Sequence, residues 1–335
     1  MVGVVFHGPG VVSLEELELP PVGPTDVLLA VEACGVCGSD LSSYAHGHYV
    51  EAGQVMGHEM SAVVVERGSG LVDLPVGQRV AVRPMRSCDA CAYCRAGDTH
   101  LCGSTYGRSL GYGVSGGFAQ RVHLGDVVVG RDVVPVPDEV DPFDLLWAEP
   151  LAVALHALEL AGGAGLDRLL VTGAGAVGLA VTAAAVAEGV TVDVVEPVAR
   201  RRDAARSLGA GAHAPGELPQ EPAYGALVDA SGVSAAVEAA LGLLQPTGPV
   251  VLVGLADSPV PWPVGAHRVV GAFGYRDPDF ARSVELIVAG RVALGRLVTN
   301  RYGLEEADRA LRAPGPGDDV VKVAILPDPA PPPEP

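Results

Sequence analysis

The chain has 335 residues, a length that predicts two domains, each able to bury a core of its own. Its 22 basic and 40 acidic residues leave a formal charge of −18, with no basic block. Such a chain repels phosphate backbones and anionic lipid, so we expect neither a nucleic-acid nor a membrane partner, and the 49% apolar content excludes bulk disorder.

The first 145 residues consist of short β-rich runs between Gly, Pro and Asp turns, a pattern typical of an antiparallel, barrel-like domain. The segment Met1–Gly10 has neither the basic stretch nor the apolar run of a secretory signal, so we expect a cytoplasmic protein. Strands are expected at Val2–Phe6, Asp26–Ala33, Ser61–Glu66, Gln78–Val82 and Phe118–His123.

Three fragments bring together residue types that bind metals. Each has an ordinary structural interpretation: Cys37 as a small buried residue, His58 as a core histidine, and Glu149 as an acid at a helix start. Together they supply a thiolate, an imidazole and carboxylates, whereas a catalytic zinc needs three protein ligands and one open position. The fragments are Cys37-Gly38-Ser39-Asp40, Gly57-His58-Glu59 and Ala148-Glu149-Pro150-Leu151.

Four cysteines lie within a short segment, in the pattern Cys88-x2-Cys91-x2-Cys94-x7-Cys102. Without a secretory signal, clustered cysteines favour a metal over disulfides. Four thiolates complete the tetrahedral shell of a zinc ion and leave no position for chemistry, so such a site would be structural. An iron–sulfur cluster is the competing metal centre, and reduced free thiols are the alternative without a metal.

The sequence pattern changes near residue 145, where predicted strands begin to alternate with predicted helices. This rhythm predicts a doubly wound α/β domain with a parallel sheet. The expected strands are Leu169–Thr172, Thr191–Glu196, Ala226–Asp229 and Pro249–Gly254, and the expected helices are Ala176–Glu188, Ala199–Leu208 and Ser234–Leu244.

A glycine motif, Gly173-Ala174-Gly175-Ala176-Val177-Gly178, follows the first of these strands. The first glycine permits a tight turn, the second lets the backbone approach a pyrophosphate, and the third lets the helix pack on the strand. The surrounding 19-residue run Leu169–Ala187 carries no charge and is long enough to span a bilayer. Its glycines and its β-prone start favour a strand, a turn and a helix instead of a membrane span.

Glu196 closes the next strand, where a carboxylate accepts hydrogen bonds from the adenosine ribose and repels a 2′-phosphate. This residue favours NAD over NADP. The run Arg200-Arg201-Arg202 leaves NADP open, because an arginine can meet a 2′-phosphate; otherwise these residues form the polar face of a helix start, one of them over the adenine.

The last part of the chain is expected to hold helices at Asp279–Ala289 and Leu304–Leu311, a strand at Val320–Leu326 and a disordered proline-rich tail at 327–335. We therefore expect a first domain over 1–145, with a metal lobe at about 86–103. A dinucleotide-binding domain over 146–272 follows, and the chain returns to the first domain over 273–326.

These motifs together resemble the zinc-dependent medium-chain alcohol dehydrogenases, in the branch of sorbitol, threonine and polyol dehydrogenases. The resemblance covers nearly the whole chain and implies a GroES-like catalytic domain joined to a Rossmann domain. The motifs on which the resemblance rests are CGVCGSD (34–40), GHE (57–59), VGQRVAV (76–82), the four-cysteine segment, GGFAQ (116–120), AEPLAVALHAL (148–158), VTGAGAVGL (171–179) and VDASG (228–232).

The resemblance implies a role for each matching residue. Cys37, His58 and Glu149 would bind a catalytic zinc, with Glu59 as a further ligand or close neighbour. Asp40 would orient a zinc ligand, and Ser39 would pass the alcohol proton outward. Cys88, Cys91, Cys94 and Cys102 would bind a structural zinc, giving two zinc ions per chain. The cofactor would contact Gly173, Gly175, Ala176, Val177, Gly178, Glu196, Arg201 and Ser231.

The chain departs from the family at several positions. Ser42 stands where the family often has a histidine that completes the proton path, and His46 and His48 are nearby but not equivalent. Ala62 replaces a usual glycine, and Arg83 stands where polyol enzymes tend to have an acid. Cys34 matches no ligand position and is expected in the core. Candidates for the substrate pocket are Tyr44, His48, Tyr112 and Phe273–Tyr275.

The resemblance implies NAD-linked oxidation of a secondary alcohol to a ketone, or the reverse, on a polyol, cyclitol or amino alcohol. Local similarity also points to the aminocyclitol dehydrogenases of 2-deoxystreptamine biosynthesis. A homodimer or homotetramer is expected. Two rival classes remain: a metal-free reductase, which would lack the zinc ligands, and a non-enzymatic dinucleotide sensor, which would have lost Cys37, His58 or Glu149.

Overall fold

The structure is a computed structural model and describes residues 1–218, 223–254, 258–260, 262, 267–312 and 319–327. It divides into two compact units. The first comprises Met1–Glu149, Arg276–Pro316 and Lys322–Pro335, and the second comprises Pro150–Tyr275 and Gly317–Val321. The first division falls after Glu149 rather than at residue 145. Apart from Pro327, the expected proline-rich tail lies outside the described residues.

The first unit is built on a seven-stranded sheet in the order β14-β15-β3-β4-β5-β7, with β6 also paired to β3. All pairs are antiparallel except β14 with β15. The central strand β3 is apolar except for Glu32, is mostly buried, and ends at the segment that leads to Cys37. The strands are β3 (Val27–Gly35), β4 (Glu59–Arg67), β5 (Arg79–Val82), β6 (Arg121–Leu124), β7 (Val133–Pro135), β14 (Val298–Gly303) and β15 (Lys322–Leu326).

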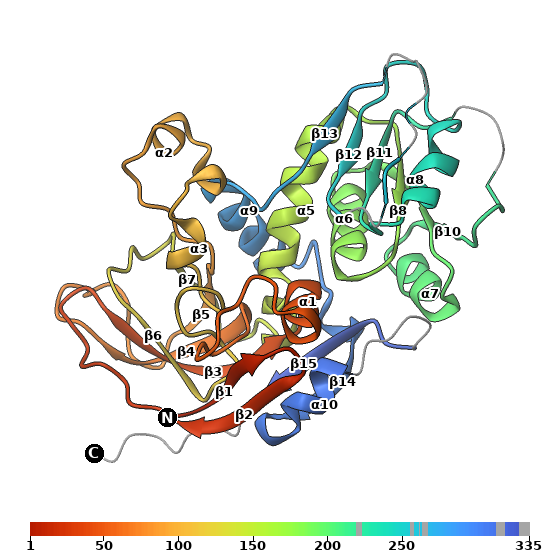
Figure 1. The fold of residues 1–335 in the computed structure, drawn as a ribbon. Helices are drawn as coiled ribbons and strands as arrows, with labels where there is room; N and C mark the ends of the chain where they lie inside the picture. Colours follow the sequence, from red (N-terminus) through yellow and green to blue (C-terminus); the bar gives the residue numbers. More distant parts are fainter. Residues whose placement is uncertain (219–222, 255–257, 261, 263–266, 313–318, 328–335) are drawn as a thin grey trace. The chain divides into compact units, whose positions relative to one another are not determined.

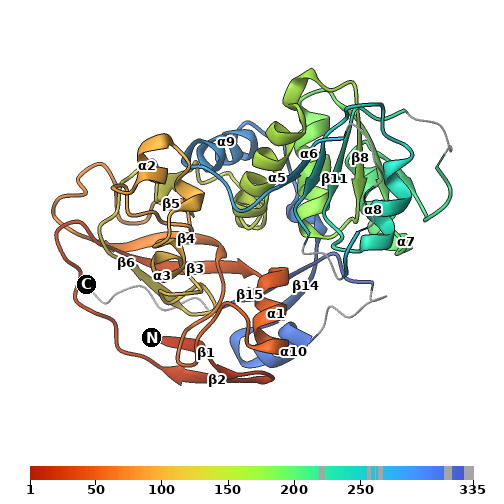
Figure 2. The same ribbon diagram turned by 45° about the horizontal axis from the view of Figure 1, so that its top comes forward.

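A hairpin and short helices surround this sheet. Strands β1 (Val2–Gly8) and β2 (Val11–Glu16) form a separate antiparallel pair. Helix α10 (Ala307–Arg312) lies beside α1 (Gly38–His46), as Figures 1 and 2 show. The remaining helices are α2 (Ala92–Ala96), α3 (Thr105–Arg108), α4 (Pro142–Leu145), α9 (Asp277–Val288) and the start of α5 (Ala148–Ala161).

The second unit holds a six-stranded, fully parallel sheet in the order β10-β9-β8-β11-β12-β13. In chain order this is 3-2-1-4-5-6, the doubly wound arrangement of dinucleotide-binding folds. The strands are β8 (Arg168–Thr172), β9 (Thr191–Val195), β10 (Gly211–His213), β11 (Ala226–Asp229), β12 (Val250–Leu252) and β13 (Val269–Gly271).

Helices α6 (Ala176–Ala187), α7 (Ala199–Ser207) and α8 (Ser234–Leu241) connect these strands, and helices flank both faces of the sheet in Figure 1. Parallel strands covered on both faces are buried throughout, which explains their continuous apolar runs. Leu170, Leu227 and Val250 from neighbouring strands pack with Val237 and Leu241 of α8 in one core cluster.

The expected α/β class is confirmed, and the expected strands and helices recur with boundaries that differ by a few residues. The run Leu169–Ala187 forms the end of β8, a glycine turn and α6, so the membrane-span alternative is wrong. Within the described residues, no helix combines the length and apolar character needed to cross a membrane. The run expected as one helix at Leu304–Leu311 is a 3-10 turn at Leu304–Glu306 followed by α10.

Candidate active site and cofactor loop

Cys37 is placed by the start of α1. Its backbone is extended, and it caps the helix that begins at Gly38. Asp40, in the first turn, accepts a hydrogen bond at Oδ2 from the Cys37 N–H over 2.9 Å. A carboxylate here also suits the positive helix N-terminus, so the local sequence fixes the thiol of Cys37 at the end of β3.

His58 and Glu59 are placed by a turn that only glycine adopts easily. Gly57 has φ of +91°, and a Cβ on it would lie 2.5 Å from the Phe118 ring. The chain then enters β4 at Glu59, so that His58 and Glu59 are both buried, at 3% and 1% exposure. Two polar side chains are thereby carried into the core of the first unit.

The side chains of Cys37, His58 and Glu59 converge, each offering a ligand atom within 4.8 Å of the others. Two buried atoms here have no hydrogen-bond partner: Glu59 Oε1, and His58 Nδ1, which faces Asp40 Oδ1 at 3.7 Å. Unpartnered buried polar atoms are rare in native proteins unless an ion or water completes them. A thiolate, an imidazole and a carboxylate are also the donors that zinc prefers, so this site fits a zinc ion.

Glu149 lies in the first turn of α5 and, among the described residues, is not part of that tight group. Burial raises the pKa of Glu149 to about 7, although His58 acts in the opposite direction. Asp40 lies 3.7 Å from His58 Nδ1 at its Oδ1. Burial disfavours the charged form of His58, but Asp40 and Cys37 raise the pKa of His58 well above its usual value.

Lys322, on β15, forms a buried ion pair with Glu59: its Nζ donates to Glu59 Oε2. Both side chains are almost fully inaccessible, and the ammonium lies 5.4 Å from the Trp147 ring centroid. Burial lowers the pKa of Lys322, but Glu59, together with Cys37 and Glu149, outweighs this effect and raises it. Glu59 therefore has one oxygen neutralised by Lys322 and the other unpartnered.

Lys322 is not among the site residues that the sequence motifs predict. A signal was available, because it is the single charge in the otherwise apolar run Val320–Leu326, and a buried lysine requires a partner.

Ser39 lies in the first turn of α1, and its Oγ is 2.9 Å from the Tyr112 hydroxyl oxygen. Ser42, the position without the family histidine, contacts His48: Ser42 Oγ lies 3.0 Å from His48 Nδ1. Tyr44, a candidate for the substrate pocket, is buried, and its hydroxyl donates to Asp308 Oδ1 over 2.5 Å, with the Gly10 carbonyl oxygen 3.2 Å away. This contact connects α1 with α10. Cys34 is fully buried, as expected.

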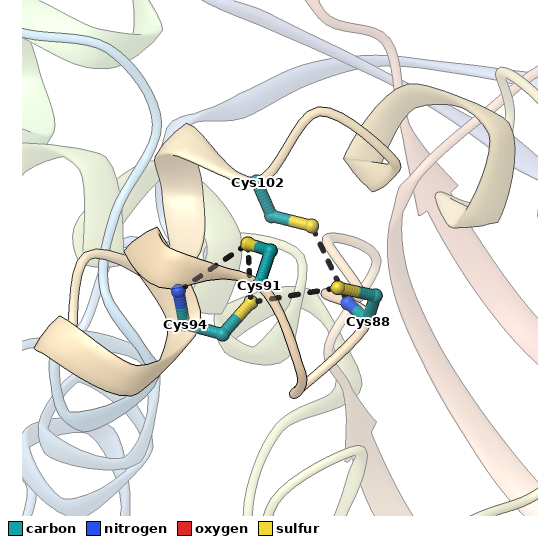
Figure 3. A group of neighbouring side chains, drawn as sticks. All are labelled: Cys88, Cys91, Cys94 and Cys102. Atoms are coloured by element: carbon teal, nitrogen blue, oxygen red, sulfur yellow. Dashed lines mark hydrogen bonds between the residues drawn. The ribbon is translucent and has the colours of Figure 1, made fainter.

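The four clustered cysteines lie together around α2, with their sulfur atoms within 4.8 Å of one another (Figure 3). We refer to residues 88–102 as the cysteine lobe. The Sγ atoms of Cys88 and Cys94 are 3.9 Å apart, and those of Cys91 and Cys94 are 3.4 Å apart. Tetrahedral zinc–thiolate bonds of about 2.3 Å separate the sulfurs by about 3.8 Å, so these cysteines fit a zinc ion. All six cysteines of the chain are free of disulfides.

A buried ionic network anchors the cysteine lobe. Arg83, where polyol enzymes tend to have an acid, is 2% exposed and pairs with Asp132 at 3.0 Å and with Asp277. Thr99 of the lobe donates to the same Asp277 carboxylate over 2.7 Å. Arg83 thus connects the sheet, the lobe and the start of α9, which is a structural role for this departure from the family.

The glycine turn of the second unit has the expected packing. A Cβ on Gly178 would lie 2.0 Å from the Gly173 carbonyl oxygen, so the helix approaches the turn as closely as glycine permits. A Cβ on Gly175 would meet nothing within 4 Å. The backbone at Gly175 therefore borders open space at the N-terminus of α6, the position where a helix end binds a pyrophosphate.

Glu196 is buried and braces this turn. Its Oε2 accepts from the Ala174 N–H and its Oε1 from the Val198 N–H, each over 2.8 Å. Arg201 donates to the Val320 carbonyl oxygen over 3.0 Å. Ser231 follows β11 and donates to the buried Asp229 carboxylate over 2.6 Å. Each carboxylate oxygen has two lone pairs, so Glu196 retains capacity for ribose hydroxyls.

Comparisons with known proteins agree with this geometry. Residues 23–138 match the alcohol dehydrogenase GroES-like domain. The chain is 30% identical to sorbitol dehydrogenase of Gallus gallus over 97% of this chain and 96% of that protein. A zinc-binding dehydrogenase of Sinorhizobium meliloti, solved with NADP, aligns with a TM-score of 0.87 at 28% identity, covering 97% and 99% of the two chains. The 2R,3R-butanediol dehydrogenase of Bacillus subtilis aligns with a TM-score of 0.86 at 26% identity, covering 98% and 99%.

Proposed function

Because the chain belongs to the zinc-dependent medium-chain polyol dehydrogenases, we propose that it oxidises a secondary alcohol of a polyol, cyclitol or amino alcohol to the ketone with NAD, or catalyses the reverse reaction. That it is a zinc-type dehydrogenase using a nicotinamide cofactor follows from its family. One observation carries the finer proposal: ligand atoms of Cys37, His58 and Glu59 converge within 4.8 Å beside unpartnered buried atoms.

In this proposal Cys37, His58 and Glu149 hold the catalytic zinc, and Glu59 is a fourth ligand or the nearest neighbour of the metal. Zinc bound there supplies a Lewis acid that lowers the pKa of the substrate hydroxyl. Asp40 fixes the Cys37 backbone and faces His58, so it orients two of the ligands. The cysteine lobe holds a second zinc, which stabilises the lobe and does no chemistry.

Ser39 receives the alcohol proton. Its hydroxyl can accept one proton and donate another, which is the requirement for passing a proton outward. The nicotinamide supplies the hydride chemistry, and the protein supplies alignment. The glycine turn would bind the pyrophosphate through Gly175, Ala176 and Val177, and Arg201 and Ser231 would border the adenosine half.

Preference for NAD rests on Glu196. A buried carboxylate at the end of β9 accepts hydrogen bonds from ribose hydroxyls and repels a 2′-phosphate. Arg201 and Arg202 already donate to backbone carbonyls, of Val320 for the first and of Glu196 and Pro197 for the second. They are therefore less available to pair with the phosphate of NADP.

Nicotinamide absorbance during turnover tests the proposal, with NAD and NADP each offered with polyols, amino alcohols and aminocyclitols. We expect reduction of NAD by one of these classes, two zinc ions per chain, and loss of turnover in Cys37→Ser with the fold retained. A matched variant, Cys34→Ser, changes a buried cysteine that is not a proposed zinc ligand and should remain active. Full activity of Cys37→Ser would overturn the metal site, and faster turnover with NADP would overturn the role of Glu196.

A further inference from the structure

Building on the proposed function, we propose that Tyr112 is a positioning residue for proton transfer: its hydroxyl holds Ser39 Oγ in the orientation that receives the alcohol proton. The two oxygens are 2.9 Å apart, within hydrogen-bond distance, although the residues are 73 positions apart in sequence. Both side chains are partly buried and belong to the first unit.

The aromatic ring of Tyr112 is held in place by its neighbours. Its centroid lies 5.1 Å from the His58 ring and 5.9 Å from the Tyr106 ring, the latter at an edge-on angle of 90°. The Tyr112 N–H also donates to the Ser109 carbonyl oxygen over 3.3 Å. Contacts on the ring and the backbone thus restrict the hydroxyl to the neighbourhood of Ser39, beside a proposed zinc ligand.

The bonding capacity of the two hydroxyls defines what this contact does. A serine hydroxyl has one proton and two lone pairs. When the Tyr112 O–H donates to Ser39 Oγ, one lone pair is filled, and the second remains for the proton of the substrate alcohol. The proton of Ser39 then points away from both, toward the next acceptor. The phenolic O–H of Tyr112 is able to donate this bond.

Tyr112 would therefore act through Ser39 and not by touching the reacting atoms. This distinguishes it from a pocket residue, the role that its aromatic side chain suggested in the sequence. If Tyr112 contacted the substrate directly, its effect would be independent of Ser39. If it positions Ser39, its effect must disappear once Ser39 has no hydroxyl.

A double-mutant cycle with Tyr112→Phe, Ser39→Ala and the double variant separates these cases. The phenylalanine keeps the ring against His58 and removes only the hydroxyl. We expect Tyr112→Phe to lower kcat about tenfold, less than the full 10²–10⁴ of an acid–base group, and to raise the solvent deuterium isotope effect. In the Ser39→Ala background the same change should have no effect. Tyr106→Phe, which removes a neighbouring hydroxyl, is the matched control and should behave as wild type.

Two readouts do not depend on turnover. Zinc content and NADH binding should be unchanged in every variant. Both single variants should melt a few degrees lower, because each leaves a partly buried hydroxyl unpaired, and the double variant should melt no lower than either. The inference would be overturned if Tyr112→Phe lowered kcat equally in the wild-type and Ser39→Ala backgrounds, or if it did not lower kcat at all. If wild type reduces no NAD, the proposed function fails, and additive melting shifts would still refute the Tyr112–Ser39 bond.

Discussion

Replacing Lys322 by methionine removes one partner of the buried pair beside the proposed metal site. The side chain keeps a similar length and volume but loses its charge. Glu59, 1% exposed, then has no cation at Oε2 and no hydrogen-bond partner at Oε1. The variant therefore tests whether the first unit depends on neutralising this carboxylate from within the protein.

The expected cost follows from burial. Breaking a fully buried pair by removing one partner typically destabilises a protein by about 3–5 kcal/mol, because the other charge stays uncompensated. In a domain of about 150–250 residues each kcal/mol shifts the melting midpoint by about 2–4 °C, so we expect a drop of roughly 6–20 °C. Removing both charges, in Lys322→Met with Glu59→Gln, should cost much less than the sum of the single changes.

The chain carries a local reporter for this experiment. Trp147 is fully buried and lies next to Lys322, whereas Trp262, in the second unit, is 41% exposed. In a Trp262→Phe background, tryptophan fluorescence during heating reports on the first unit alone. Zinc should be in excess for all variants, so that loss of metal does not add to the measured shift.

A surface pair provides the matched control. Arg309 is 72% exposed and lies 3.2 Å from Glu306, an arrangement that contributes about 1 kcal/mol or less. Arg309→Met should therefore leave the midpoint of Trp147 fluorescence within a few degrees of wild type. If Lys322→Met also stays in that range, our reasoning about the buried charge is refuted.

Three further predictions concern other parts of the chain. Gly178→Ala should destabilise the second unit by about 1–3 kcal/mol, because its Cβ would meet the Gly173 carbonyl, whereas Gly175→Ala should leave the melting temperature unchanged and weaken NADH binding in titrations. Burial raises the pKa of Asp132, but the Val128 N–H and nearby arginines including Arg83 outweigh burial and lower it. Ionised Asp132 therefore stabilises the folded protein fully above about pH 4, and this contribution is lost as the pH falls through the folded-state pKa. Asp132→Asn should remove this contribution, seen as less pH-dependent acid unfolding. Stripping zinc should release two ions per chain and expose the cysteine lobe to limited proteolysis.

The sequence predicted the elements whose periodicity and turn chemistry act locally. Strands β3, β8 and β11 are apolar runs bounded by turns, and the glycine motif predicted the connection from β8 to α6. Short strands such as β10 and β13 were not predicted. Each has three residues and depends on pairing with a neighbour that is distant in sequence, which is information that no local window contains.

The candidate site was predictable where ligands occur in compact motifs. The cysteine lobe gathers four ligands within 15 residues, so its spacing alone indicates a metal. Cys37 and His58 were identified through the family resemblance and lie together in the structure. In the sequence, Arg83 is only a departure from the acid usual in the family. Its structural role could not be predicted, because its two acidic partners, Asp132 and Asp277, come from distant parts of the chain.

Lys322 and Tyr112 show why the partners of the site residues could not be predicted, even where, as for Lys322, the sequence marks a residue that needs one. Each acts by completing a hydrogen-bonding group of a residue far away in sequence, Glu59 in one case and Ser39 in the other. Neither belongs to a motif, because a lysine in a strand and a tyrosine in a loop are common. Lys322 meets Glu59 only because β15 pairs with β3 and β3 pairs with β4, which brings the strand that carries Lys322 close to Glu59. The ligands of such a site are therefore set by local motifs, while their charge and orientation are set by the fold.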